Sequence, residues 1–170
     1  MREIIRNGEI VTDTLQYVDS REAAMEVDGD VCVPCHVLAS GLDGIVRPGR
    51  RVGVLAECTR PVFELAPFLP QLDIVVIPFA KFGDGRGYSM ARLVRDRFGF
   101  GGELRARGDV LRDQAFYLRR CGFNAFESKD SSRLPGILKA FEDFRDVYQP
   151  ASDIPLPAWR RHELPRAVAG

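Results

Sequence analysis

The most constraining feature of the sequence is its most apolar run, Leu72 to Phe79, which is apolar throughout from Ile74 onward. A strand without polar alternation is typical of a parallel sheet buried on both faces. Further strands are predicted over 51–56, 103–107 and 124–128, with helical patterns between them. These serial β-α units predict an α/β fold with a mainly parallel sheet, either an open doubly wound sheet or half of a β/α barrel.

The N-terminal residues follow a different pattern. Residues 3–11 predict a hairpin, because Asn7-Gly8 suits a type I′ turn between two short apolar pairs. Residues 13–30 are polar and predict a connecting segment with a short helix over 21–25. A second short helix is predicted over 34–42.

The C-terminal part is predicted to form the last helix of the domain, followed by an extended tail. A helix is expected from Ser132 to Pro150, with Phe144 and Tyr148 on its buried face. Residues 1–150 therefore form one predicted α/β domain. Residues 151–170 hold three prolines and one tryptophan, Trp159, and predict a Pro-rich C-terminal tail.

Composition excludes several classes of protein. The 24 basic and 24 acidic residues balance, whereas a nucleic-acid-binding protein usually carries a basic excess. No run approaches the roughly 18 apolar residues of a membrane span. The first residues do not resemble an export signal, so we expect a cytoplasmic protein with reduced cysteines.

The segment Cys32-Val33-Pro34-Cys35-His36 matches the C-x-x-C-H pattern of covalent haem attachment. That chemistry usually follows export, which the sequence does not predict, so we interpret both cysteines as ordinary buried thiols. With two histidines in the chain, a zinc site is not expected, and we predict no bound metal. No flavin, nicotinamide or cluster motif is present, and we predict no cofactor.

Candidate site residues follow the predicted strands at their carboxyl ends, where ligands bind in parallel α/β folds. After the central strand, Lys81, Asp84 and Arg86 stand in a glycine-rich loop that leads into a helix. Such a loop suits an anion, although its glycines are equally compatible with a tight turn. It matches neither the P-loop pattern nor GxGxxG.

The next two strands end with further polar residues. Arg105 and Arg107 alternate with apolar residues and are predicted on one side of a strand. Arg105 either faces a ligand or belongs to a buried network with carboxylates, for which Asp109 and Glu127 are candidates. Asp109 is also predicted as the N-cap of a helix over 110–121, in which Arg112 lies. The candidate anion-binding or partner-binding set is therefore Lys81, Asp84, Arg86, Arg105, Asp109, Arg112 and Glu127.

Several runs resemble one family, the bacterial domain of unknown function 934. They are Phe82-Gly83-Asp84-Gly85-Arg86-Gly87-Tyr88-Ser89, Gly102-Glu103-Leu104-Arg105-Ala106 and Gly108-Asp109-Val110-Leu111-Arg112-Asp113-Gln114, with Arg119-Arg120-Cys121-Gly122-Phe123. The resemblance is specific over residues 72–128 and is not expected to extend past Pro150. Family members are described as probable oxidoreductases involved in sulfite reduction.

The resemblance implies a pathway and no catalytic residue. We therefore expect an accessory protein of assimilatory sulfite reduction, a partner or subunit of sulfite reductase. One alternative is an enzyme or carrier that acts on a small sulfur oxyanion at the charged loops. Another is a module that binds sirohaem, whose carboxylates would suit Arg86, Arg105 and Arg112.

Overall fold

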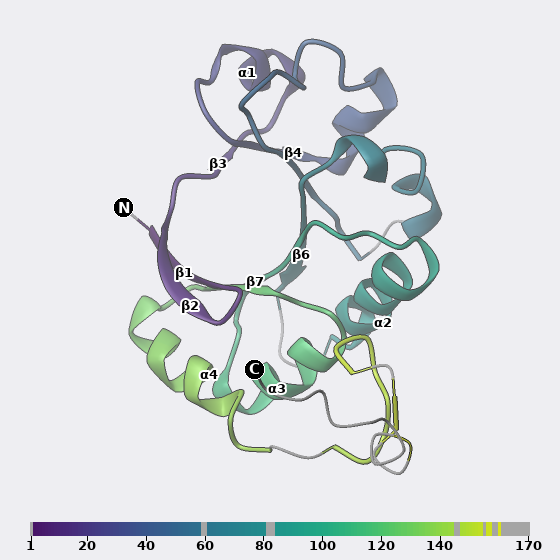
Figure 1. Ribbon diagram of the computed structural model, residues 1–170. Coiled ribbons are helices and arrows are strands. Elements are labelled where there is room, and N and C mark those ends of the chain that lie inside the picture. Colours follow the sequence, from purple (N-terminus) through teal and green to yellow (C-terminus); the bar gives the residue numbers. More distant parts are fainter. Residues whose placement is uncertain are drawn as a thin grey trace, which may run out of the picture.

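The computed structural model describes residues 2–58, 61–80, 84–144, 147–154, 156–157 and 160 of the 170-residue chain (Figure 1). Lys81 and Trp159, both singled out from the sequence, lie outside the described residues. No helix in the described part of the chain is long and apolar enough to cross a bilayer.

The predicted N-terminal hairpin is confirmed. Strands β1 (Arg2–Arg6) and β2 (Glu9–Asp13) pair antiparallel along their whole length. Between them Asn7 and Gly8 have φ values of 51° and 86°, the two positive angles that a type I′ turn requires.

The sheet has eight strands in the order β2-β1-β8-β7-β6-β5-β4-β3. Its remaining strands are β3 (Gln16–Tyr17), β4 (Val31–Pro34), β5 (Val52–Leu55), β6 (Ile74–Phe79), β7 (Glu103–Gly108) and β8 (Ala125–Ser128). The four strands predicted from the sequence are β5 to β8, and they are adjacent and parallel. Because β1 runs antiparallel to β8 and to β2, the sheet is mixed, and the expectation of a mainly parallel sheet is corrected.

Strand order decides between the two predicted architectures. From β3 to β8 the order in the sheet follows the order in the chain, so successive crossovers turn the same way and place their helices on one face. The sheet curls into a half barrel with its helices outside (Figure 1), and the doubly wound alternative is wrong. The edge strands β2 and β3 are consecutive in the chain, separated by Thr14 and Leu15 alone.

The sequence pattern missed β3 and β4. β3 has two residues, too few for any periodicity, and β4 ends at Pro34, where a helix was expected. The predicted helix is a 3₁₀ helix, η1 (Cys35–Ser40). Further 3₁₀ helices are η2 (Val62–Glu64), η3 (Leu69–Gln71) and η5 (Ser131–Arg133).

The α-helices are α1 (Arg21–Glu26), α2 (Arg86–Arg92), α3 (Arg112–Arg120) and α4 (Leu134–Ala140), and the π-helix η4 (Leu93–Arg97) continues α2. Asp109 is not the N-cap of α3. That position belongs to Leu111, whose N–H donates to the side chain of Gln114 at 3.3 Å.

The last helix is shorter than predicted. α4 packs against β1, β2 and α3 and ends at Ala140. Phe141, the residue after it, is buried in the main apolar core. Phe144 and Tyr148 lie beyond it and are 62% and 69% exposed, so the prediction that they are buried is wrong.

The two faces of the sheet differ in chemistry. The convex face, under the helices, carries the main apolar core. The concave face has only a small apolar cluster, formed by Leu15, Cys32, Ile74 and Val76 with Tyr17 and Leu55 packed against it. The rest of that face is ionic, and it leads to the candidate site.

Candidate functional site

A buried arginine lies at the centre of the concave face. Arg105 of β7 is 0% exposed, and its guanidinium binds Asp13 of β2 through two hydrogen bonds, Nη1 to Oδ2 at 2.8 Å and Nη2 to Oδ1 at 2.9 Å. Its Nε donates to Glu103 Oε1 at 2.7 Å, and Nη1 also donates to Glu127 Oε2 at 3.0 Å. One cation therefore joins the hairpin to β7 and β8.

Four more arginines surround these carboxylates. Arg2 and Arg6 of β1 bind Asp13 at 2.6 Å and 2.9 Å. Arg6 and Arg51 reach Glu103, Arg51 also binds Asp30, and Arg107 binds Glu127. The described network thus holds five arginines against four carboxylates, and one positive charge is not compensated within it.

The network keeps its central groups charged. Burial alone would raise the pKa of Asp13, but hydrogen bonds and charge from Arg105 and Arg2 outweigh it, and the pKa falls below its ordinary value. For Arg105, burial would lower the pKa, but Asp13 and Glu103 more than compensate and the pKa rises. Both groups therefore stay ionised near neutral pH.

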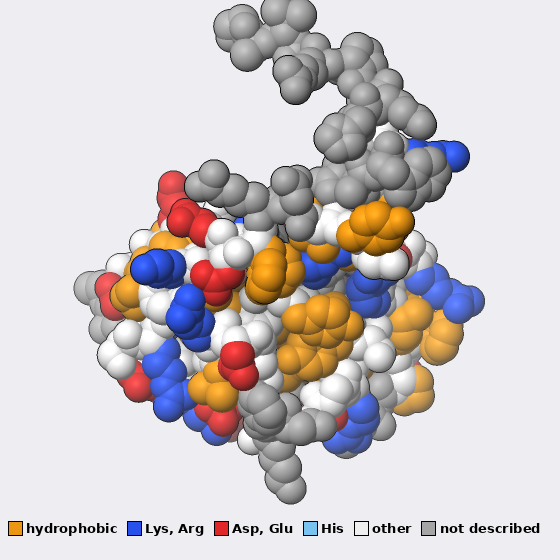
Figure 2. Space-filling model, turned by 90° about the horizontal axis from the view of Figure 1, so that it is seen from below, with side chains coloured by type: hydrophobic (Ala, Val, Ile, Leu, Met, Phe, Trp, Pro, Cys, Tyr) orange, Lys and Arg blue, Asp and Glu red, His pale blue; other side chains and the backbone are white. Residues whose placement is uncertain are grey.

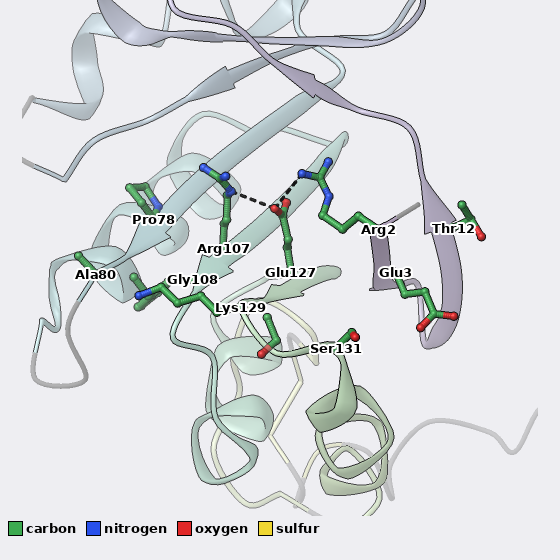
Figure 3. A pocket seen from close by; sticks show the side chains of 12 residues that line it. Arg2, Glu3, Thr12, Pro78, Ala80, Arg107, Gly108, Glu127, Lys129 and Ser131 are labelled. Carbon is green, nitrogen blue, oxygen red and sulfur yellow. Dashed lines mark hydrogen bonds and ion pairs between the residues drawn. The ribbon is translucent and has the colours of Figure 1, made fainter.

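A cavity of about 750 Å³ opens beside this network, at the carboxyl ends of β6, β7 and β8. Its lining is Pro78, Phe79 and Ala80 from the end of β6, Arg107 and Gly108 from β7, Glu127, Ser128, Lys129 and Ser131 from β8 and the segment after it, and Arg2, Glu3 and Thr12 from the hairpin. Figure 3 shows the hairpin as one wall and the strand ends as the other.

Glu127 is fixed between two arginines at the side of the cavity (Figure 3). Its Oε1 accepts from Arg107 Nε at 2.9 Å and lies 3.2 Å from Arg2 Nη1. The hydroxyl of Tyr17 donates to Oε2 at 2.5 Å, and the Arg107 guanidinium lies 3.9 Å above the Tyr17 ring. Burial raises the pKa of the Tyr17 hydroxyl, so it stays protonated and able to donate.

Lys129 adds a third cationic side chain to the lining of the cavity, beside Arg2 and Arg107. It follows β8 directly, its N–H donates to the carbonyl of Gly108 at 3.0 Å, and its side chain is exposed. Among the described residues the Lys129 ammonium has no hydrogen-bond or ion-pair partner. An unpaired ammonium beside a network with a surplus positive charge makes this end of the sheet attractive to an anion.

A glycine in the lining of the cavity lets two strand ends approach each other closely. Gly108 has a φ of 125°, and a Cβ atom there would lie 2.4 Å from the carbonyl oxygen of Phe79. Only glycine allows β7 to end so close to β6.

The structure places the predicted site residues in several locations. Arg105 and Glu127 are brought together, and Arg105 belongs to the carboxylate network that the sequence left as an alternative to a ligand contact. Lys81 lies outside the described residues, and the other four members of the set form separate, exposed ion pairs outside the cavity lining. These pairs are Arg86 with Asp84 at 2.7 Å, Arg133 with Asp109 at 3.3 Å, and Arg112 with Asp143 at 3.1 Å.

Sequence reasoning missed the contributions of the hairpin and of β3. Arg2, Asp13 and Tyr17 were not considered, and neither Arg107 nor Lys129 was selected. One signal was available, because alternation places Arg2 and Arg6 on the same face of a strand, where charges need partners.

The described His, Cys, Asp and Glu side chains are the groups that could hold a metal ion or a cluster. Among the described residues, no group of three or more His, Cys, Asp or Glu side chains is arranged to hold a metal ion. Cys32 and Cys35 are free thiols that belong to opposite faces of the sheet, and burial raises the pKa of Cys32 to about 12. This placement does not suit a paired role for the C-x-x-C-H segment.

Comparison with protein families gives one match. The family described as Bacterial protein of unknown function (DUF934) matches residues 53–159, more than half of the chain. The matched region holds Arg105, Arg107, Glu127 and Lys129, and it extends beyond Pro150, where the resemblance was expected to end. A comparison with curated proteins finds no match.

Replacing Arg105 tests whether the network holds the fold. Arg105→Met leaves three carboxylates without their central cation, and we expect the free energy of unfolding to fall by about 3–5 kcal/mol. Urea denaturation at neutral pH measures this. The control is Arg92→Met, which breaks an ion pair of similar length, 2.7 Å, between half-exposed side chains. It should cost less than about 1 kcal/mol, and equal losses in the two variants would contradict the assignment.

Proposed function

Since the chain belongs to the DUF934 family of bacterial proteins of unknown function, we propose that it is an accessory protein of assimilatory sulfite reduction. In this proposal it binds a small sulfur oxyanion in the cavity at the ends of β6, β7 and β8, and a partner reductase carries out the reduction. The pathway follows from the family resemblance of the sequence. The proposal that the ligand is an anion is supported by the cationic side chains of the cavity.

The observation that carries the proposal is the pair of cations at the carboxyl edge of the sheet. Ligands bind at this edge in parallel α/β folds and in β/α barrels. Lys129 has no partner among the described residues, and Arg107 lines the cavity while its Nε is held by Glu127. A tetrahedral or pyramidal oxyanion between them would receive charge-assisted hydrogen bonds, which are the strongest available to a protein.

The accessory role is supported by the chemistry of the chain's own donors. Reduction of sulfite needs a cofactor that relays electrons, and iron–sulfur clusters are held by several convergent cysteines. Here Cys32 and Cys121 are buried in different parts of the core, and Cys58 follows β5. They do not form such a set.

A surface suited to a partner is also present. Tyr117, Phe144 and Tyr148 are each more than half exposed, and aromatic contacts link Tyr88 to Tyr117 and Phe116 to Phe144. Viewed from below, apolar side chains gather near the middle of one face with cationic side chains around them (Figure 2). Exposed aromatic side chains are enriched at protein–protein interfaces.

The sirohaem alternative gains no support from the arrangement of its arginines. Arg105 is fully buried, and Arg86 and Arg112 are each paired with a separate carboxylate. The three side chains offer no common surface to one ligand.

Binding of sulfite can be measured by isothermal titration calorimetry. We expect the purified chain to bind sulfite and Lys129→Gln to bind it about tenfold or more weakly, because a hydrogen bond to a charged group contributes about 1.5–3 kcal/mol. The control is Lys139→Gln, an exposed lysine of α4 outside the cavity lining, which should bind as the parent does. No binding by the parent, or equal loss in both variants, would refute the site.

Growth of a deletion strain tests the pathway. Without the gene, growth with sulfate as the sulfur source should slow, and growth with cysteine should be normal. Complementation with Lys139→Gln should restore growth, complementation with Lys129→Gln should not, and the parent chain should co-purify with sulfite reductase. If the isolated chain converts a sulfur oxyanion with no partner present, it is an enzyme, and the accessory role is wrong.

A further inference from the structure

Strands β1 and β8 separate where they reach the cavity. In the described chain β1 pairs with β8 only at Ile5 and Arg6, although it pairs with β2 along all five of its residues. If the β1–β8 ladder continued, the next hydrogen-bonded pair would be Glu3 with Ser128. Both of these residues line the cavity instead.

The two registers decide which backbone groups face this gap. Arg6 and Glu9 form the hydrogen-bonded pair that closes the two-residue turn, so every second residue of β1 counted from Arg6 directs its backbone N–H and C=O toward β2. The residues between them, which include Glu3, direct these groups toward β8. On β8, the N–H of Lys129 donates to Gly108 of β7, so the preceding residue, Ser128, directs its backbone groups toward β1. The gap is thus bordered by two strand edges with the hydrogen-bonding pattern of a ladder.

The size of the cavity points to a ligand larger than an inorganic ion. About 750 Å³ lies within the range of roughly 300–1,000 Å³ that is usual for organic ligands, far above the needs of one oxyanion. Pro78, Phe79 and Ala80 give it an apolar side, and Lys129 and Arg107 give it a cationic one.

On the basis of the proposed anion site, we infer that the cavity takes the free carboxyl end of a peptide, held in extended form between β1 and β8. Its main chain completes the interrupted ladder at Glu3 and Ser128, and its carboxylate binds Lys129. Strand addition at an exposed edge and capture of a terminal carboxylate are established ways in which proteins recognise peptides. A sulfur oxyanion would occupy the carboxylate position alone.

The probe is N-acetyl-Ala-Ala with a free carboxylate, titrated into the ¹⁵N-labelled full chain and followed by NMR. We expect the amide resonances of Glu3, Ser128 and Lys129 to shift together. The C-terminally amidated dipeptide should bind about fivefold more weakly, because it lacks the ion pair. Sulfite should shift the resonance of Lys129 and leave that of Glu3 unchanged.

A matched pair of variants isolates the backbone contact. Glu3→Pro removes the N–H that faces the gap, and proline is tolerated at strand edges where its nitrogen makes no ladder bond. It should bind the dipeptide about fivefold more weakly than Glu3→Ala, which also removes the carboxylate but keeps the N–H, and the two variants should bind sulfite equally.

The outcomes separate this inference from the proposed function. Sulfite binding at Lys129 without dipeptide shifts at Glu3 and Ser128 overturns the peptide inference and keeps the oxyanion site. If the dipeptide shifts the resonances of all three residues and sulfite shifts none, the peptide inference is supported and the proposed binding of a sulfur oxyanion is refuted. The absence of both responses overturns both proposals.

Discussion

The structure depends on the burial of one guanidinium. Arg105 cannot lose its charge and has no access to water, so carboxylates must converge on it, and they come from three strands. Asp13 arrives from the N-terminal hairpin, Glu103 from β7 itself and Glu127 from β8. The same contacts that neutralise Arg105 therefore link the antiparallel hairpin to the parallel strands across the concave face of the half barrel.

The network also shapes the site. Its carboxylates are fewer than its arginines, and three of its members, Arg2, Arg107 and Glu127, line the cavity together with Lys129. Glu127 belongs both to the buried network and to the cavity wall, and Tyr17 holds it from a third direction. One side chain thus belongs both to the network that joins the strands and to the candidate site.

The sequence was sufficient for features set by local pattern and insufficient for those set by long-range pairing. Apolar runs predicted β5 and β6, the alternation of strand and helix patterns predicted β7 and β8, and Asn7-Gly8 predicted the hairpin. β3 is too short to show a strand pattern in the sequence, and it is a strand because its two residues pair with the edge of β4. At the site, Arg105 and Glu127 were predicted because they lie on two strands that the sequence pattern predicts as neighbours. Asp13 was missed because it is 92 residues away from its partner in the chain.

The central claim is that Lys129 and Arg107 form an anion site at the ends of β7 and β8. A crystal structure of the protein soaked with selenite, a heavier analogue of sulfite, tests it directly, because selenium is located by its anomalous scattering. The account predicts a selenium peak with its oxygens in hydrogen-bond reach of the Lys129 ammonium and the Arg107 guanidinium. A peak beside Arg86 at the start of α2, with the cavity at β8 unoccupied, would contradict it.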